Sequence, residues 1–288
     1  MNAQTKLSTL AGLALLMALT PAAHAINGCT NNWPLYGTYG MQFYGATAPN
    51  LAGGVGGVIA PLSSAGGSPV AAVAPLQSTG GIAVGFAQLT LDGAGGVSGI
   101  SHANLNGAWS EGTVTGAYTV NNDCTLSLSL VDLSGASQNF TGAVVERGTG
   151  AVLIQTDAGT GVSAELQSTR NWCATPDLTG TFSFRSFGSM VGANSGGSAY
   201  SSVGLLSLDG QGNATATESR FVNGASYQVA SSGAITVNAD CSVAVALTPT
   251  TGSGNSLNFR GFLSSDETQM ILVQTDANTA VRGSVMVQ

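Results

Sequence analysis

The sequence predicts an all-β protein made of two tandem eight-stranded antiparallel up-and-down barrels behind a secretory leader. Three observations lead to this prediction. A long pattern of residues recurs at a constant offset of 117 positions. Short runs that alternate apolar with small polar residues recur about every dozen residues, separated by turns containing Gly, Asn or Asp. Outside the leader, no long segment has the 3.6-residue period of an amphipathic helix.

The internal repeat is clearest between Leu89–Thr125 and Leu206–Ser242, which align without a gap. Upstream, Leu35 maps to Leu178 at an offset of 143, so the first repeat carries 26 extra residues. They fall near residues 46–81, a stretch rich in Gly, Ala, Pro and Ser, which we expect to form a long loop. The predicted division is a signal peptide at 1–25, a first barrel repeat at 26–170 and a second at 171–288.

Residues 1–25 have the three parts of a secretory signal: Lys6 near the start, an apolar core from Leu7 to Leu19, and Ala23-His24-Ala25 as a small-residue cleavage site. The apolar core is too short to anchor the chain in a bilayer. We therefore expect export to the periplasm or the extracellular space. One alternative is a lipoprotein processing box ending at Cys29, which would make that cysteine lipidated.

The four cysteines favour disulfides, because an even number in an exported chain meets an oxidising compartment. Each repeat has one cysteine near its start and one at the end of its Val-Asn-x-Asp-Cys stretch. Duplication therefore favours one bridge per repeat, Cys29–Cys124 and Cys173–Cys241. Lipidation of Cys29 would leave Cys124 without a partner.

Alternation predicts eight strands in each repeat. One set of side chains is apolar in both copies and the intervening set is small and polar, as in Leu126, Leu128 and Leu130 against Val243, Val245 and Leu247. A single buried face and short turns favour a meander that closes into a barrel, which removes both sheet edges; a β-sandwich remains the alternative. In chain order, the expected strands are Tyr36–Tyr44, Ile82–Leu91, Gly96–Asn104, Thr113–Val120, Thr125–Leu133, Gln138–Glu146, Ala151–Thr156, Gly161–Gln167, Gly180–Phe187, Ser201–Leu208, Ala214–Val222, Ser232–Val237, Ser242–Leu247, Ser256–Leu263, Gln269–Gln274 and Ala280–Val287.

Four pairs of residues suit two-residue hairpin turns, which require positive φ. These pairs are Asp92-Gly93, Asn106-Gly107, Asp209-Gly210 and Asn223-Gly224.

Composition excludes several functional classes. Charged residues make up 7% of the chain, and the only lysine is in the leader, so the mature chain has six arginines against fourteen acidic residues, a net charge of about −8. Such a surface repels phosphate backbones, and no basic patch is present, so nucleic acid is not an expected partner. An outer-membrane barrel is disfavoured, because most expected strands are short and aromatic residues make up only 6%. No membrane span is expected in the mature chain.

Few residues could carry chemistry. His102 is the only histidine after the leader, and no H-E-x-x-H, C-x-x-C or Gly-x-Ser-x-Gly motif is present. We predict no catalytic residue, metal site or cofactor. The repeated polar signature is Gln155-Thr-Asp157, matched by Gln274-Thr-Asp276. Its Gln and Asp lie two apart, so they are either polar anchors inside a barrel pocket, a role that Tyr118 would share, or turn formers.

The motifs Leu-Asp-Gly-x-Gly, Gly-Ala-Tyr/Ile-Thr-Val-Asn-x-Asp-Cys and Gln-Thr-Asp resemble those of secreted bacterial proteins of unknown function. Their barrels are similar to those of the allene oxide cyclase and calycin (lipocalin-like) group. The resemblance covers most of each repeat and implies the barrel fold. It carries over no catalytic residue, because the shared motifs are turn and disulfide residues.

Three functional hypotheses follow. The first is an exported, non-enzymatic binding protein that takes a small apolar ligand inside a barrel. The second is an extracellular matrix or cell-surface structural protein, motivated by the low charge and the Gly, Ser, Thr and Asn content. The third is a cyclase or isomerase that uses a barrel cavity, with His102, Glu111 or Tyr118 handling protons.

Overall fold

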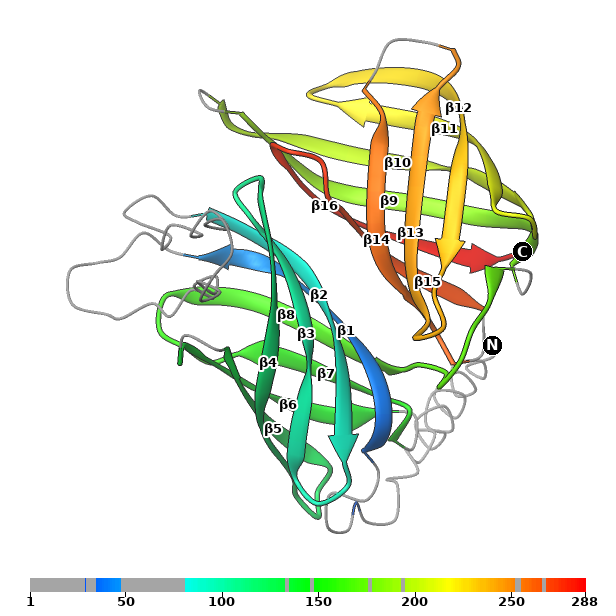
Figure 1. The fold of residues 1–288 in the computed structure, drawn as a ribbon. Helices are drawn as coiled ribbons and strands as arrows, with labels where there is room; N and C mark the ends of the chain where they lie inside the picture. Colours follow the sequence, from blue (N-terminus) through cyan, green and yellow to red (C-terminus); the bar gives the residue numbers. More distant parts are fainter. Residues whose placement is uncertain are drawn as a thin grey trace, which may run out of the picture.

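The computed structural model describes residues 29, 35–47, 81–132, 135–145, 148–175, 178–192, 195–251, 255–265 and 268–288. The leader and almost all of the 46–81 insertion lie outside these residues. The described chain forms sixteen strands, eight in each repeat, with one barrel drawn in blue to green and the other in green to red (Figure 1). Their bounds are β1 Tyr36–Thr47, β2 Gly81–Asp92, β3 Gly96–Leu105, β4 Ala108–Val120, β5 Thr125–Asp132, β6 Ser137–Val145, β7 Gly150–Gln155, β8 Thr160–Ser168, β9 Thr179–Gly192, β10 Ser195–Asp209, β11 Asn213–Val222, β12 Ala225–Val237, β13 Ser242–Pro249, β14 Leu257–Leu263, β15 Gln269–Gln274 and β16 Thr279–Val287.

Each repeat closes into its own barrel, which confirms the predicted fold. Consecutive strands pair antiparallel, β1 pairs with β8, and β9 pairs with β16. A sandwich would leave two separate sheets, and neither repeat has them. We refer to β1–β8 as barrel one and to β9–β16 as barrel two. Among the described residues, no helix combines the length and apolar character needed to cross a bilayer.

The main departures from the expected strands are in β4, β9, β10 and β12, which extend several residues beyond the expected bounds. These strands continue into polar and glycine-rich sequence where alternation is weak, because a neighbouring strand supplies backbone partners there. For example, β12 begins at Ala225 instead of Ser232.

Two of the four expected turns are confirmed and two are wrong. Asn106-Gly107 and Asn223-Gly224 form two-residue turns in which every residue has positive φ. Asp92-Gly93 and Asp209-Gly210 instead begin three-residue connections. In the first, the Asp92 carboxylate accepts hydrogen bonds from the backbone N–H groups of Ala94 and Gly96 at 2.7 and 2.8 Å, which holds the longer loop in place.

Both barrels are filled by the apolar face that alternation assigned to them. The side chains of Leu126, Leu128 and Leu130 are buried in barrel one, and those of Val243, Val245 and Leu247 are buried in barrel two. The two interiors form separate hydrophobic clusters, so each repeat has its own core.

The predicted disulfides are both formed, one in each barrel. Cys29–Cys124 spans 95 residues of sequence and Cys173–Cys241 spans 68. Cys124 and Cys241 both have positive φ, at 66° and 65°, so duplication preserved an uncommon backbone conformation together with the bridge. Two disulfides indicate that the protein folds in an oxidising environment.

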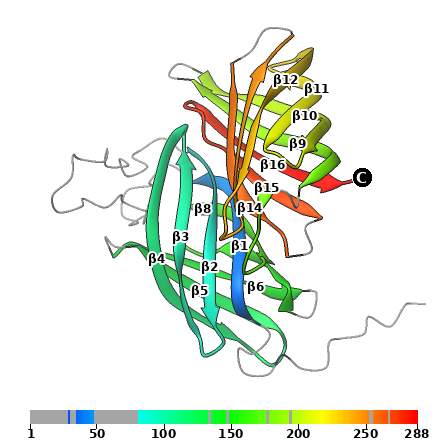
Figure 2. The ribbon, with the colours of Figure 1, turned by 45° about the vertical axis from the view of Figure 1, so that its right-hand side comes forward.

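The barrels pack against each other through outward-facing apolar residues of β2, β14, β15 and β16. Phe262 is fully buried, and its ring lies against Gly40 of β1, where a Cβ atom would overlap the ring. Figures 1 and 2 show barrel two seated on this side of barrel one. The contact forms a third hydrophobic cluster, distinct from both interiors, whose buried members are Val84, Phe86, Phe262, Ile271, Val273 and Ala280.

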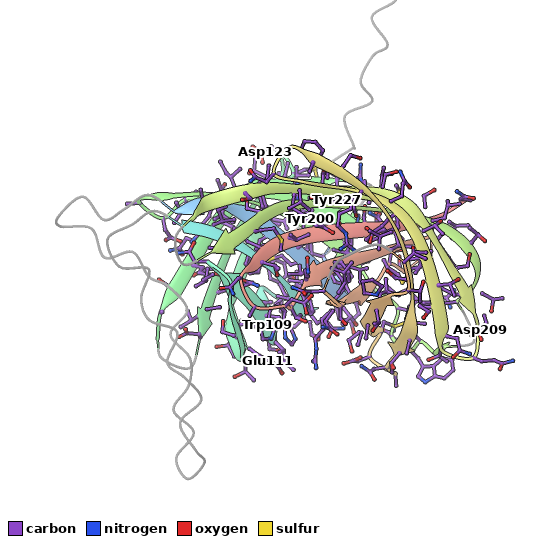
Figure 3. All side chains as sticks on the ribbon, turned by 90° about the horizontal axis from the view of Figure 1, so that it is seen from above. Trp109, Glu111, Asp123, Tyr200, Asp209 and Tyr227 are labelled. Carbon is purple, nitrogen blue, oxygen red and sulfur yellow. A yellow bond between two sulfur atoms is a disulfide. The ribbon has the colours of Figure 1, made fainter. Side chains whose placement is uncertain are left out.

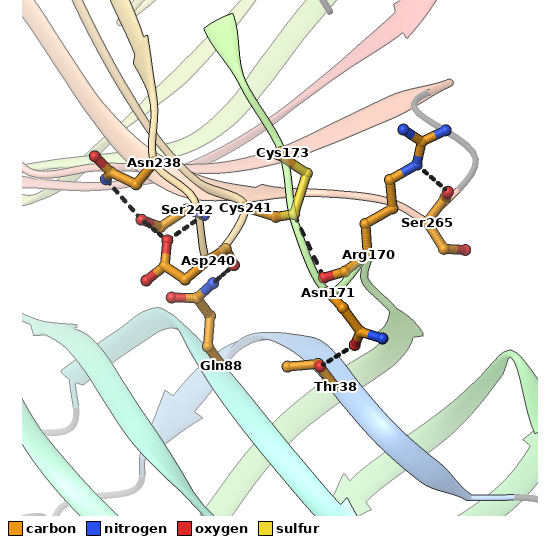
Figure 4. The surroundings of a disulfide bond; sticks show 10 residues. All are labelled: Thr38, Gln88, Arg170, Asn171, Cys173, Asn238, Asp240, Cys241, Ser242 and Ser265. Carbon is orange, nitrogen blue, oxygen red and sulfur yellow. Dashed lines mark hydrogen bonds between the residues drawn. A yellow bond between two sulfur atoms is a disulfide. The ribbon is translucent and has the colours of Figure 1, made fainter.

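Polar contacts complete the packing of the barrels near the second disulfide (Figure 4). Gln88 of β2 donates through Nε2 to the backbone oxygen of Asp240 at 2.9 Å, one residue before Cys241. Thr38 of β1 donates to the side-chain oxygen of Asn171 at 3.1 Å. The segment between β8 and β9, which contains Asn171, and the β12–β13 turn of barrel two therefore both contact barrel one.

Candidate binding site inside barrel two

The two barrels differ most at one end of their interiors. Near the disulfide, inward positions are apolar in both, but toward the opposite end barrel two places polar side chains where barrel one has small or apolar ones. The counterparts, barrel one first, are Phe43 and Ser186, Ala83 and Tyr200, Gly85 and Ser202, Ser101 and Glu218, Ala103 and Arg220, and Val114 and Ser231.

Strand register places all six polar residues on the inner face. Glu218 and Arg220 follow Ala214 and Ala216 at two-residue steps on β11, and those alanines belong to the barrel core. Ser202 lies opposite Arg220 on one side and opposite Ser186 on the other. The group therefore spans β9 to β12 as one continuous inner patch, which we call the polar cluster: Ser186, Tyr200, Ser202, Glu218, Arg220 and Ser231.

A salt bridge lies at the centre of the polar cluster. Arg220 donates through Nη2 to Glu218 Oε1 at 2.5 Å. The Glu218 side chain is 1% exposed and that of Arg220 is 8% exposed. Each charge is compensated by the other, which buried charges require. The pair uses only part of its hydrogen-bonding capacity, since Glu218 Oε2 and Arg220 Nε are buried without a partner.

Tyr200 lies beside this ion pair. Burial raises the pKa of its hydroxyl, and the negative charge of Glu218 raises it further, against the opposing influence of Arg220 and the hydroxyls of Ser186 and Ser202. Those serines bond to each other at 2.9 Å. Both serines lie close to the Tyr200 hydroxyl, but neither contact has the geometry of a hydrogen bond, so that hydroxyl is buried without a partner. It is therefore a neutral phenol that can both donate and accept.

The cluster holds an unusual concentration of unpaired polar atoms. Three of these atoms belong to Glu218, Arg220 and Tyr200, and a fourth is the buried Ser231 hydroxyl. The fifth is Oε1 of Gln274, which lies on β15 opposite Phe259 and faces the same interior. Each such atom costs about 1–3 kcal/mol of desolvation if nothing satisfies it. Five such atoms at one barrel end are best satisfied by a bound group that has both hydrogen-bond donors and acceptors.

An aromatic residue marks the rim of this barrel end. Tyr227 of β12 lies directly opposite Arg220 and is 44% exposed. Figure 3 labels Tyr227 with Tyr200, and shows Asp209 at the other end of β10. The site thus combines an exposed aromatic ring with buried polar side chains on the same face of β11 and β12. We call Tyr227 and the polar cluster, with Gln274, the barrel-two mouth.

The repeated Gln-Thr-Asp motif forms the same hydrogen-bonded clamp in both barrels. The Asp157 carboxylate accepts from the backbone and side-chain nitrogens of Asn139 and from Gln155 Nε2, all within 2.9 Å. Asp276 accepts equivalent bonds from Asn258 and Gln274. Burial opposes ionisation of Asp157, but the bonds from Asn139 and Gln155 outweigh it and lower its pKa. Both carboxylates are committed to the turn before β8 or β16.

The structure brings together two of the three residues of the enzymatic hypothesis. His102 and Glu111 are cross-strand neighbours on the outside of barrel one, with His102 Nδ1 3.2 Å from Glu111 Oε2, although the geometry does not make a hydrogen bond. The His102 ring stacks on Phe86 with 4.4 Å between ring centres, beside Trp109. Tyr118 instead points into barrel one and donates to the backbone oxygen of Leu35 at 2.6 Å. The three residues do not form one site.

His102 predicts a pH dependence of stability. Burial lowers its pKa below the ordinary 6.5, against Glu111 and Asp240, while Arg260 adds to the lowering. The unfolded chain therefore binds a proton more readily than the folded one, so stability is complete above about pH 6.5 and falls as the pH drops below it. No other histidine follows the leader. Urea unfolding between pH 5 and 8 should show this slope in the wild type and lose it in His102→Gln; an unchanged slope in the variant would contradict the assignment.

A surface groove of about 320 Å³ lies on the outer wall of barrel two, over β12, β13 and β14. Arg260 supplies its only charge, and the other lining side chains are mostly small: Ala234, Thr236, Ala244, Ala246, Asn258 and Thr275. Among the described residues, the groove included, no three His, Cys, Asp or Glu side chains lie together as a metal site requires.

Comparison with known proteins adds no functional assignment. No protein-family model matches the chain. No curated protein is significantly similar to it.

Sequence reasoning missed the polar cluster, although a signal for it exists. Counting in steps of two from Ala214 places Glu218 and Arg220 on the inner face, and aligning the repeats shows that their counterparts are Ser101 and Ala103. A charged pair at inward positions of only one copy is the pattern that would have identified the site.

Proposed function

We propose that the protein is an exported, non-enzymatic binding protein that holds a small molecule in the barrel-two mouth. The observation that carries the proposal is the five unpaired buried polar atoms at this end of barrel two. Eight-stranded barrels are just wide enough to hold side chains or one small ligand. The leader-like segment at 1–25 and the two disulfides support an exported location, periplasmic or extracellular.

Duplication supports a role in binding over one in folding. Barrel one closes with serine and alanine at the positions of Glu218 and Arg220, so the fold does not require the ion pair. Replacing a buried ion pair by well-packed residues is often neutral or stabilising, which makes its presence in one copy a cost that function explains.

The polar cluster modifies the ligand expected from the sequence. A wholly apolar molecule would leave the five polar atoms unpaired. A ligand with hydrogen-bonding groups facing the polar cluster and some apolar surface toward the Tyr227 ring fits the mouth better.

The test uses a variant that gives barrel two the residues of barrel one, Glu218→Ser with Arg220→Ala. A library of uncharged, hydrogen-bonding fragments is screened by ligand-observed NMR against wild type and variant. We expect fragments that bind the wild type and lose at least tenfold in affinity in the variant. Native mass spectrometry of freshly exported protein should also show an added mass only in the wild type. A library without a hit, or hits that bind both proteins equally, would contradict the proposal.

A further inference from the structure

We infer that the ligand of the barrel-two mouth is an uncharged molecule with several hydroxyl groups, such as a saccharide ring. This inference rests on the proposed binding function and adds the ligand's chemical class. It follows from the charge of the site, from its mixture of donors and acceptors, and from the ring at its rim.

The charge balance of the site favours a neutral ligand. Glu218 and Arg220 are the only charged side chains that the described strands of barrel two direct into the interior, and they are paired at 2.5 Å. Their charges cancel, so an incoming anion or cation would find no uncompensated partner there. A buried charge without a partner is costly, which selects against charged ligands.

The unpaired atoms require a ligand that both donates and accepts. Arg220 Nε can only donate, whereas Glu218 Oε2 and Gln274 Oε1 can only accept. The Tyr200 and Ser231 hydroxyls can do either. A carboxylate or phosphate would match only the donors, and an ammonium group only the acceptors. Hydroxyl groups meet both needs, because each has one donor hydrogen and two acceptor lone pairs.

The rim supplies the apolar part of the recognition. Tyr227 is 44% exposed and lies opposite Arg220, so its ring faces whatever occupies the mouth. The faces of a sugar ring are made of C–H groups, while its edge carries hydroxyls. A flat aromatic surface beside a buried polar floor therefore matches both parts of a saccharide ring.

A small apolar ligand is the principal alternative. It could pack against Tyr227 but would seal the five polar atoms from water without replacing their hydrogen bonds. Because each unsatisfied buried atom costs about 1–3 kcal/mol, such a ligand would bind weakly or not at all.

The inference is tested by isothermal titration calorimetry and saturation-transfer NMR on the full mature chain. The neutral probes are D-glucose, D-galactose, D-mannose and myo-inositol; the charged ones are D-glucuronate and D-glucosamine; the apolar one is N-phenyl-1-naphthylamine. We expect at least one neutral probe to bind, and its charged analogue to bind at least tenfold more weakly.

Variants locate the binding. Glu218→Ser with Arg220→Ala should reduce affinity at least tenfold, and Tyr227→Ser severalfold. Tyr36→Ser, which removes a 74% exposed tyrosine from barrel one, is the matched control and should leave affinity unchanged. Circular dichroism confirms that each variant is folded.

The outcomes separate the class of ligand from the existence of the site. Binding of the apolar probe alone, abolished by the double variant, would overturn the saccharide inference and leave the binding function in place. Binding of the charged probes alone, abolished by the double variant, would also overturn the saccharide inference and leave the binding function in place. If no probe binds and the fragment screen also finds nothing, both proposals are wrong.

Discussion

Replacing Arg220 by methionine should lower the free energy of unfolding by about 3–5 kcal/mol, because it leaves the Glu218 carboxylate buried without its counter-charge. Glu218 is 1% exposed on its side chain, and no other positively charged side chain of the described strands of barrel two faces this interior, so no second cation replaces the guanidinium. Urea denaturation followed by far-UV circular dichroism measures the change. Transitions of the two barrels must be fitted separately if they do not coincide.

The double variant Glu218→Ser with Arg220→Ala provides the control. It removes both charges together, as in barrel one, and should recover most of the lost stability. The two results together would show that the ion pair is locally interdependent but dispensable for folding. Equal destabilisation in the single and double variants would instead give the pair a structural role and weaken the case for binding.

Removing the Cys173–Cys241 bridge by a double serine substitution should cost about 4 kcal/mol. The bridge spans 68 residues, and the loop-closure entropy that it removes from the unfolded chain grows only slowly with length. The equivalent change at Cys29 and Cys124, which spans 95 residues, should therefore cost almost the same. Guanidinium denaturation of the two variants makes the comparison.

Reduction of the wild type with dithiothreitol is the control for this pair. It should reproduce the combined loss of both bridges, provided that reduction is complete. A wild type whose unfolding midpoint does not move on full reduction would show that the bridges contribute little to stability.

The barrel-to-barrel packing shows where sequence reasoning reached its limit. Phe86 and Phe262 lie on the outer face of their strands, next to inward residues that are also apolar or glycine. Apolar residues on both faces weaken the two-residue alternation, and the sequence does not indicate which surface covers the outer face. Only the folded chain reveals that Phe262 packs against Gly40, more than two hundred residues away in the sequence.

The sequence by itself determined the duplication, the sixteen strands, the core-facing side of the strands whose alternation is clear, and the pairing of the cysteines. These features are readable because strand side chains alternate with period two, and because two copies of one pattern report each assignment twice. The tertiary structure decided how far the strands extend, how the barrels dock, and that Glu218, Arg220, Tyr200 and Ser231 meet at one barrel end. Those features depend on closure, which brings together residues from separate strands. The polar atoms that lack a hydrogen-bond partner at this barrel end can be recognised only once every neighbouring strand is in place.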